Sequence, residues 1–297
     1  MDPLKKYQKK HLRKSMAGQS EKKKREATRM EIQSNNSNRV TLFKKGFFLK
    51  FVIIVILVAG LYLYSVRQTN ASLPRMFASF PLFFRMLRED FWPPDFAYFS
   101  TALNQLIETF NIALISTTLA ALLAFPLLFL SSSTVNRHPL SYRSFRFIMT
   151  VIRSVPNIIM VVLMVAVVGL GSVSGILALT IYSAAVLIKL TSESVETIDG
   201  RPILAIKAIG GNTPQVIRYG ILPQLMPLYL SHILYMLEIN LKASVVLGFV
   251  GAGGIGQLIR RQMSLFRYDR LGMIIFVLFI VISIIDYISQ TVRSRLV

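Results

Sequence analysis

Two long runs of uncharged residues constrain this chain more than any other feature of its sequence. Residues 109–136 and 154–188 contain no Asp, Glu, Lys or Arg, over 28 and 35 positions. About 20 predominantly apolar residues are enough for a helix to cross the hydrocarbon core of a bilayer. With 53% hydrophobic and 16% charged residues overall, the sequence predicts an all-α integral membrane protein.

The longer run must contain a turn. A helix over 154–188 would be about 52 Å long, too long for one crossing of a core that is about 30 Å thick. Gly169, Gly171 and Gly175 predict the turn within it. We therefore expect about six transmembrane helices, at residues 46–66, 109–136, 147–168, 173–190, 219–237 and 271–285.

The chain begins with a basic tail, residues 1–45. Residues 1–50 hold fifteen of the 34 Lys and Arg residues and only four of the 14 acidic ones. This composition favours disorder, and basic segments are retained on the cytoplasmic side of a membrane. We expect a disordered cytoplasmic N-terminal tail that rests on anionic lipid. A nucleic-acid-binding arm is the less favoured alternative.

Basic residues in the loops set the expected topology. The tail, the C-terminus and the loops 131–146 and 190–218 carry Lys and Arg, which places them in the cytoplasm. The segment 67–106 then lies outside, and its nine aromatic residues between Phe77 and Phe99 predict an extracytoplasmic, interfacial layer. Four arginines fall on the outer side against the rule: Arg260, Arg261, Arg267 and Arg270.

A glycine-rich segment lies late in the chain. Gly251, Gly253 and Gly256 match the pattern G-x-G-x-x-G, and Gly254 is a fourth glycine. A dinucleotide site would need a preceding strand and an acidic residue about 20 positions on. The neighbours here are predicted membrane helices, and Asp269 comes only thirteen residues after Gly256. We therefore expect a broken, non-helical turn that lines a cavity at an outer gate.

Nothing in the sequence supports enzyme chemistry. The P-loop pattern G-x-x-x-x-G-K-[ST] does not occur, so ATP is not expected to bind this chain. His11, His138 and His232 are scattered, and there is no cysteine. Neither a metal site nor a catalytic residue is predicted.

Charged residues inside predicted spans are costly and point to function. Glu238 and Lys242 lie four residues apart, in the order that favours an ion pair. The pair either only positions its helix or lines a transport path, and both interpretations stay open. Arg153, three residues before Pro156, either extends to the inner membrane surface or faces the same path.

The cytoplasmic loop 193–223 is amphipathic and too long for a simple turn. Residues 205–208 predict a short helix, with Ala205 and Ala208 on it, that Gly210 and Gly211 stop. A linker then leads through Leu222 and Pro223 into the next span. This helix–turn–helix on the membrane face is suited to being held by a partner protein.

The spacing of this loop resembles the coupling motif of ABC-importer permeases. Ala205, Gly210, Leu222 and Pro223 match that motif, whereas Leu204, Ile206 and Gly220 replace three of its residues. Residues 238–257, which include Asn240, resemble permeases of phosphonate importers more closely. Further similarities within 74–290 are Pro93–Asp95, Glu108–Thr109, Arg153–Pro156, Gly169–Gly171, Lys189, Glu193 and Glu196, while Asn157–Ile158 depart from the family pattern.

The resemblance implies a type I ABC-importer permease fold with a core at 107–292. It implies a multi-pass protein of the bacterial plasma membrane that forms a homodimer. Two copies of a separate ATPase would hold ATP and Mg, and an extracytoplasmic binding protein would deliver a phosphonate or a phosphite-like anion. This chain itself would need no cofactor and bind no nucleic acid. The alternative is a permease of a related importer for methionine or another small solute.

The resemblance also implies roles for individual residues. Coupling to the ATPase would fall to Ala205, Ala208, Gly210, Gly211, Leu222 and Pro223. The translocation path and gate would include Arg153, Pro156, Glu238, Asn240, Lys242, Gly251, Gly253, Gly254 and Gly256. An ion channel would need no coupling loop, and a membrane enzyme would need convergent His or carboxylate side chains in its spans.

Overall fold

The computed structural model describes residues 45–69, 73–136 and 138–296. The chain divides into two units, residues 1–80 and 81–297. The predicted basic tail lies outside the described residues except for Lys45. In the first unit, helix α2 (Lys45–Thr69) contains a 20-residue apolar segment whose side chains are exposed. This is the exposure expected of a helix that lies in lipid.

The second unit is built from helices, and its described residues contain no β-strand. Helix α3 (Leu73–Glu89) crosses from the first unit into it. The remaining α-helices are α4 (Phe99–Leu127), α5 (Pro139–Ser154), α6 (Asn157–Val168), α7 (Ser172–Thr197), α8 (Gly200–Ala208), α9 (Thr213–Gln215), α10 (Leu222–Leu247), α11 (Gly254–Ser264) and α12 (Tyr268–Leu296). Short helical turns at Phe96–Tyr98, Val216–Ile221 and Gly248–Val250 connect them.

The expected set of membrane spans is confirmed with one correction. Five helical segments of the described chain are long and apolar enough to cross a membrane, and a bent helix pair can supply a sixth span. The single helix predicted over 147–168 is wrong, because α5 and α6 meet at 88°. Pro156 has no N–H to donate and pushes the preceding Val155 into an extended conformation, so the helix ends before it.

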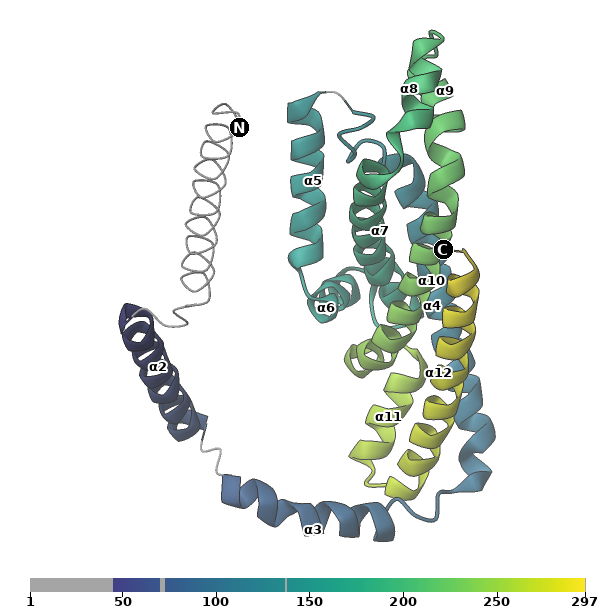
Figure 1. Cartoon of the computed structure of the whole chain (residues 1–297). Helices are drawn as coiled ribbons and strands as arrows, with labels where there is room; N and C mark the ends of the chain where they lie inside the picture. The colour runs from purple at the N-terminus through teal and green to yellow at the C-terminus, as the bar shows by residue number, and fades with distance from the viewer. Residues whose placement is uncertain (1–44, 70–72, 137, 297) are drawn as a thin grey trace, which may run out of the picture. The chain divides into compact units, whose positions relative to one another are not determined.

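Helices α4, α7 and α10 form the centre of the second unit, where they lie side by side (Figure 1). Small buried residues such as Ala120, Ala124 and Ala184 allow the helices to approach closely. Asn240 of α10 is fully buried, accepts a hydrogen bond from Ser183 of α7 and donates one to Thr117 of α4, both 2.9 Å long. A buried amide with both groups paired fixes the register of three helices.

The second unit has two ends, and α4 runs from one to the other. At one end, residues 131–136 lie near the end of α7, and α8 and α9 lie at the same end (Figure 1). At the other end, Asp95 N–H donates to the carbonyl of Asp269 at 3.2 Å, and Arg270 pairs with the Asp95 carboxylate at 3.3 Å. The arginine-bearing turn therefore lies at the same end of the unit as the segment before α4.

These arginines are partly neutralised at this end of the unit. Arg267 pairs with Asp269 at 3.3 Å, in addition to the pair between Arg270 and Asp95. The hydrogen bond to Asp269 raises the pKa of Arg267 above its ordinary value. Two of the four arginines therefore have acidic partners, but the positive-inside rule counts Lys and Arg and gives acidic residues little weight, so its conflict with the expected topology remains.

Candidate functional site

The short helix α8 begins at a charged cap. The Asp199 carboxylate accepts the backbone N–H of Arg201 at 2.9 Å and pairs with the Arg201 guanidinium at 2.7 Å. The hydrogen bond from the Arg201 side chain lowers the pKa of Asp199, so the cap stays ionised at neutral pH. Gln224 of α10 receives the Asp199 N–H at 3.1 Å, which ties the start of α8 to the start of α10.

One face of α8 packs onto the rest of the chain. Ile203 is buried, and Ile206 packs against the same cluster, which includes Val216 and Ile221 of the turn before α10. Gly220 lies in this turn, and a Cβ there would be 3.3 Å from side-chain atoms of both isoleucines. The glycine that departs from the coupling motif at 220 therefore lets α8 pack closely.

The glycines after α8 end the helix as predicted. Gly210 has φ +83°, a conformation that side-chain-bearing residues rarely adopt, and Gly211 N–H donates to the Ile206 carbonyl at 2.9 Å. The next helical turn starts at a capping box formed by Asn212 and Gln215. These caps set the angle at which the chain returns towards the membrane.

The opposite face of α8 is uncovered. Ala205 and Ala208 are exposed, and Leu204 and Ile209 are 66% and 85% exposed beside them. Leu222 is half-buried at the start of α10, whereas Pro223 is exposed there. Small and apolar side chains on a projecting helix form the kind of surface that a protein partner covers.

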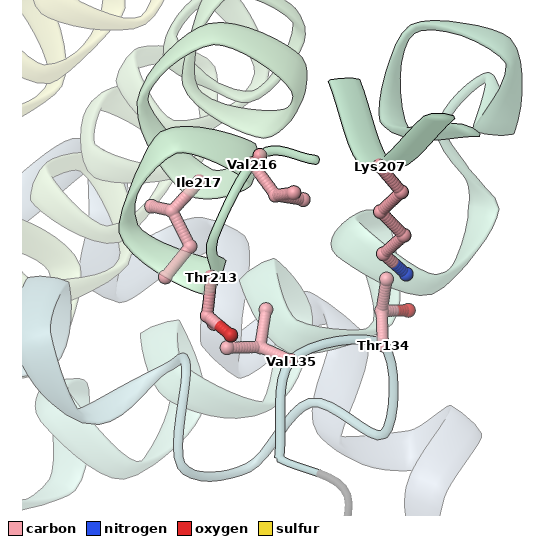
Figure 2. Close-up of a pocket in the computed structure, with 7 residues that line it drawn as sticks. Thr134, Val135, Lys207, Thr213, Val216 and Ile217 are labelled. Atoms are coloured by element: carbon pink, nitrogen blue, oxygen red, sulfur yellow. The ribbon is translucent and has the colours of Figure 1, made fainter. Parts of the chain in front are cut away.

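A small hollow lies under this loop (Figure 2). It has a volume of about 50 Å³, and the Lys207 side chain extends towards Thr134 at one side of it. The other lining residues are Val135, Gly211, Thr213, Val216 and Ile217. The volume suits ordered water and is far below the roughly 300 Å³ at which small-molecule sites begin. The hollow is therefore part of the packing of the loop.

A polar cluster joins the same end of the molecule to α5. Glu196, near the end of α7, accepts hydrogen bonds from the N–H and hydroxyl of Ser133, at 3.0 and 2.7 Å. Arg146 of α5 donates to the same carboxylate at 2.8 Å and to the Ser131 carbonyl at 3.0 Å. The bent pair α5–α6 is thus bonded to the helix that leads into α8.

The glycine-rich segment forms a shorter break than predicted. Gly251 and Gly253 have φ +98° and +79°, and α11 already starts at Gly254, which has φ +69°. The predicted non-helical turn over 251–256 is therefore corrected to residues 251–253. Gly256 lies in the first turn of α11, where its lack of a side chain lets α11 pack on the Val245 carbonyl of α10.

The charged pair in α10 belongs to a four-residue network. Lys242 pairs with Glu238 and with Asp286 of α12, both at 2.9 Å. Glu238 also pairs with Arg293 of α12 at 2.9 Å. Two acids and two bases give a neutral group that joins α10 to α12. The i,i+4 spacing in the sequence indicates the pair of Glu238 and Lys242. Their partners on α12, Arg293 and Asp286, lie 55 and 44 positions away, and spacing within one helix does not indicate them.

Arg153 has a different environment. It is half-buried in the last turn of α5, next to the bend at Pro156. It makes no hydrogen bond or ion pair with any residue that the structure describes. Asn240, predicted beside the path, lies fully inside the α4–α7–α10 core. Of the predicted path residues, Arg153 therefore offers a positive charge that no acid within the described part of the chain neutralises.

The described residues hold no cluster that suits a metal. No group of three or more His, Cys, Asp or Glu residues converges within 45–69, 73–136 and 138–296.

Comparison with known proteins agrees with this arrangement. A family model described as "Binding-protein-dependent transport system inner membrane component" matches residues 116–296. The chain is 32% identical to the phosphite transport system permease protein PtxC of Stutzerimonas stutzeri, over 68% of this chain and 74% of that protein. It is 34% identical to the phosphate-import permease protein PhnE of Mycolicibacterium smegmatis, over 75% of this chain and 41% of that protein.

The fold also matches a solved transporter. A chain of the MetNI methionine ABC transporter, in an inward-facing conformation, gives a TM-score of 0.62 at 21% identity. The match covers 68% of this chain and 99% of the MetNI chain. The architecture is thus that of type I ABC-importer permeases. Together with the family match over residues 116–296, it shows that the chain belongs to the inner membrane components of binding-protein-dependent transport systems.

Proposed function

We propose that this chain is the permease subunit of an ABC importer that moves a phosphonate, or a phosphite-like anion, into the cell. The observation that carries the proposal is the 32–34% identity with permeases named for phosphite and phosphate transport. The likeness to the methionine transporter is 21% in sequence and concerns the fold. We therefore favour a phosphorus oxyanion over methionine as the transported solute.

The uncovered face of α8 supports a coupling role. In this proposal the permease is a homodimer, and two copies of a separate ATPase bind ATP and Mg. Each ATPase copy binds the α8 helix of one permease subunit. An extracytoplasmic binding protein delivers the anion to the opposite end. ATP binding and hydrolysis shift the equilibrium between inward-open and outward-open states. The permease itself carries out no covalent chemistry.

The orientation follows from the same proposal. Helix α8 must lie in the cytoplasm to meet the ATPase, and an even number of crossings then also places the N-terminus inside the cell. The turn that holds Arg267 and Arg270 lies at the extracytoplasmic end, where it can meet the binding protein.

Uptake in cells tests the solute. We expect a strain that lacks this gene to lose uptake of radiolabelled methylphosphonate, and the parent strain to lose it when excess unlabelled phosphite is added. Excess methionine should leave uptake unchanged. Competition by methionine without competition by any phosphorus oxyanion would overturn the proposal in favour of the alternative.

A further inference from the structure

Two helices begin at the same point of the molecule, opposite a carboxylate. Helix α7 starts at Ser172, and its hydroxyl donates to Glu108 Oε1 of α4 at 2.8 Å. Helix α11 starts at Gly254, and its second residue, Ile255, donates its N–H to the Thr109 hydroxyl of α4 at 2.7 Å. Adjacent residues of α4 therefore hold the starts of α7 and α11.

The second oxygen of this carboxylate is also engaged. With its amide oriented to satisfy its neighbours, Gln105 donates to Glu108 Oε2 and to the Gly254 carbonyl, both at 3.3 Å. Glu108 is half-buried and lies beside the positive end of the α7 dipole. A charged acceptor with two donors forms stronger hydrogen bonds than a neutral one.

The glycine break packs closely against the side chains of Glu108, Ser172 and Thr109. A Cβ on Gly253 would lie 2.8 Å from Glu108 Oε1 and 2.9 Å from Ser172 Oγ, and a Cβ on Gly254 would lie 2.5 Å from Thr109 Oγ1. These glycines are therefore required by close approach as well as by their positive φ angles. Backbone flexibility alone would not explain contacts of this kind.

The other side of the break is held by α7. Gly171 N–H donates to the Gly251 carbonyl at 2.9 Å. Gly175 of α7 packs against Ala252, which is 2% exposed, so closely that a Cβ at Gly175 would be 3.0 Å from the alanine Cβ. The break is thus fixed at several points between α4 and α7.

We propose that Glu108 is a positioning residue for the gate, whose carboxylate holds the break at 251–253 against the start of α7. The role of the break as a gate rests on the proposed function. The position of the break does not, and it can be measured without substrate or ATPase. Movement of the gate then requires the hydrogen bond between Glu108 and Ser172 to open.

The absence of cysteine from the chain makes labelling a clean test. Leu247, the last residue of α10 and four positions before the break, and Leu187, in the core of α7, are 2% and 0% exposed. Each is replaced by cysteine in the full chain in membranes, giving matched reporters near to and far from the break. The labelling rate of each cysteine by a small maleimide is then measured with and without a change at Glu108.

We expect Glu108→Ala to raise the labelling rate at position 247 by at least about tenfold, since loss of the hydrogen bond to Ser172 favours local opening. The labelling rate at position 187 should stay unchanged. Glu108→Gln should have a smaller effect, and the neighbouring Ile107→Ala, at an exposed position, none. If Glu108→Ala does not assemble in membranes, Glu108→Gln decides by the same criteria.

Equal labelling of Cys at 247 in the parent and the Glu108 variants would overturn the inference, as would an equal rise at both reporters, which indicates general loosening. A selective rise at 247 in a protein that transports no phosphorus oxyanion would keep the positioning role and reject the proposed function. In a transporting protein, the maximal uptake rate should fall while KM stays unchanged, because Glu108 acts on the gate and not on the anion.

Discussion

Lys242 Nζ lies 2.9 Å from an oxygen of Glu238 on its own helix and 2.9 Å from an oxygen of Asp286 on α12. The sequence leaves two roles open for this pair, either to position its helix or to line the transport path, where the lysine would weakly attract the passing anion. With two carboxylates around it and Arg293 bound to Glu238, its charge is already neutralised. The geometry favours the structural role, and the attraction for the anion stays a prediction.

Replacing this lysine should therefore affect stability more than affinity. Lys242→Met leaves Glu238 and Asp286 without a shared partner, at a cost of about 1–3 kcal/mol for a partly exposed network. We expect a lower midpoint of thermal unfolding in detergent and an unchanged KM for uptake, with Lys242→Arg close to the parent. A raised KM at unchanged stability would instead show that Lys242 contacts the anion.

Arg153 should behave in the opposite way. Its charge has no acidic partner among the described residues, and it lies at the 88° bend between α5 and α6. We expect Arg153→Met to raise KM for the anion about tenfold, the loss of one charge–charge contact at about 1.4 kcal/mol. The effect should shrink as salt concentration increases. Uptake kinetics at several ionic strengths provide the measurement.

The exposed Arg143 of the same helix is the matched control for this prediction. Arg143→Met should leave KM unchanged. If both variants raise KM equally, Arg153 has no specific contact and only the general positive potential of the segment matters.

The uncovered face of α8 gives the third prediction. Ala205 is exposed, so Ala205→Glu should fold normally while placing a charge in the contact with the ATPase. We expect ATP hydrolysis stimulated by the binding protein to fall at least about tenfold, since a buried unpaired charge at an interface costs several kcal/mol. Co-purification of the two subunits and ATPase assays provide the measurements. Ser100→Glu, at an exposed position of the opposite end, is the control.

Gly210 gives a separate test of the same loop. Its φ of +83° is strained for any β-branched residue. Gly210→Val should tilt the α8–α9 turn and uncouple hydrolysis from uptake while the permease remains in the membrane. Gly200→Ala, where nothing lies within 4 Å of the added Cβ, should leave both activities intact. Normal coupling in Gly210→Val would remove the turn from the mechanism.

The number of spans could be predicted because charge-free length depends only on local sequence. The run at 109–136 predicted a helix that the structure places at Phe99–Leu127, since the uncharged residues after Leu127 turn towards Glu196. Helix α7 continues beyond the predicted end at 190 because Lys189 and Glu193 form an i,i+4 pair at 2.6 Å. Ends of helices depend on such pairs and on tertiary contacts.

The contacts that organise the sites could not be predicted in the same way. The missing N–H of Pro156 indicates a break in the helix, but the charge-free length used to define the spans does not register a proline. The partners of Lys242 on α12 and of Ile255 on α4 join positions that are far apart in sequence. Spacing within one helix gives no information on such contacts. The sequence therefore indicated Glu108 and Thr109 only through the resemblance to the permease family.

We propose above that this chain carries a phosphorus oxyanion across the membrane when an ATPase drives it. The most direct measurement is uptake of radiolabelled methylphosphonate into proteoliposomes that contain the permease and the ATPase, with the binding protein outside and ATP inside. We expect ATP-dependent accumulation that excess phosphite inhibits and Ala205→Glu abolishes. Accumulation without ATP, or ATP-dependent uptake of methionine with none of methylphosphonate, would contradict it.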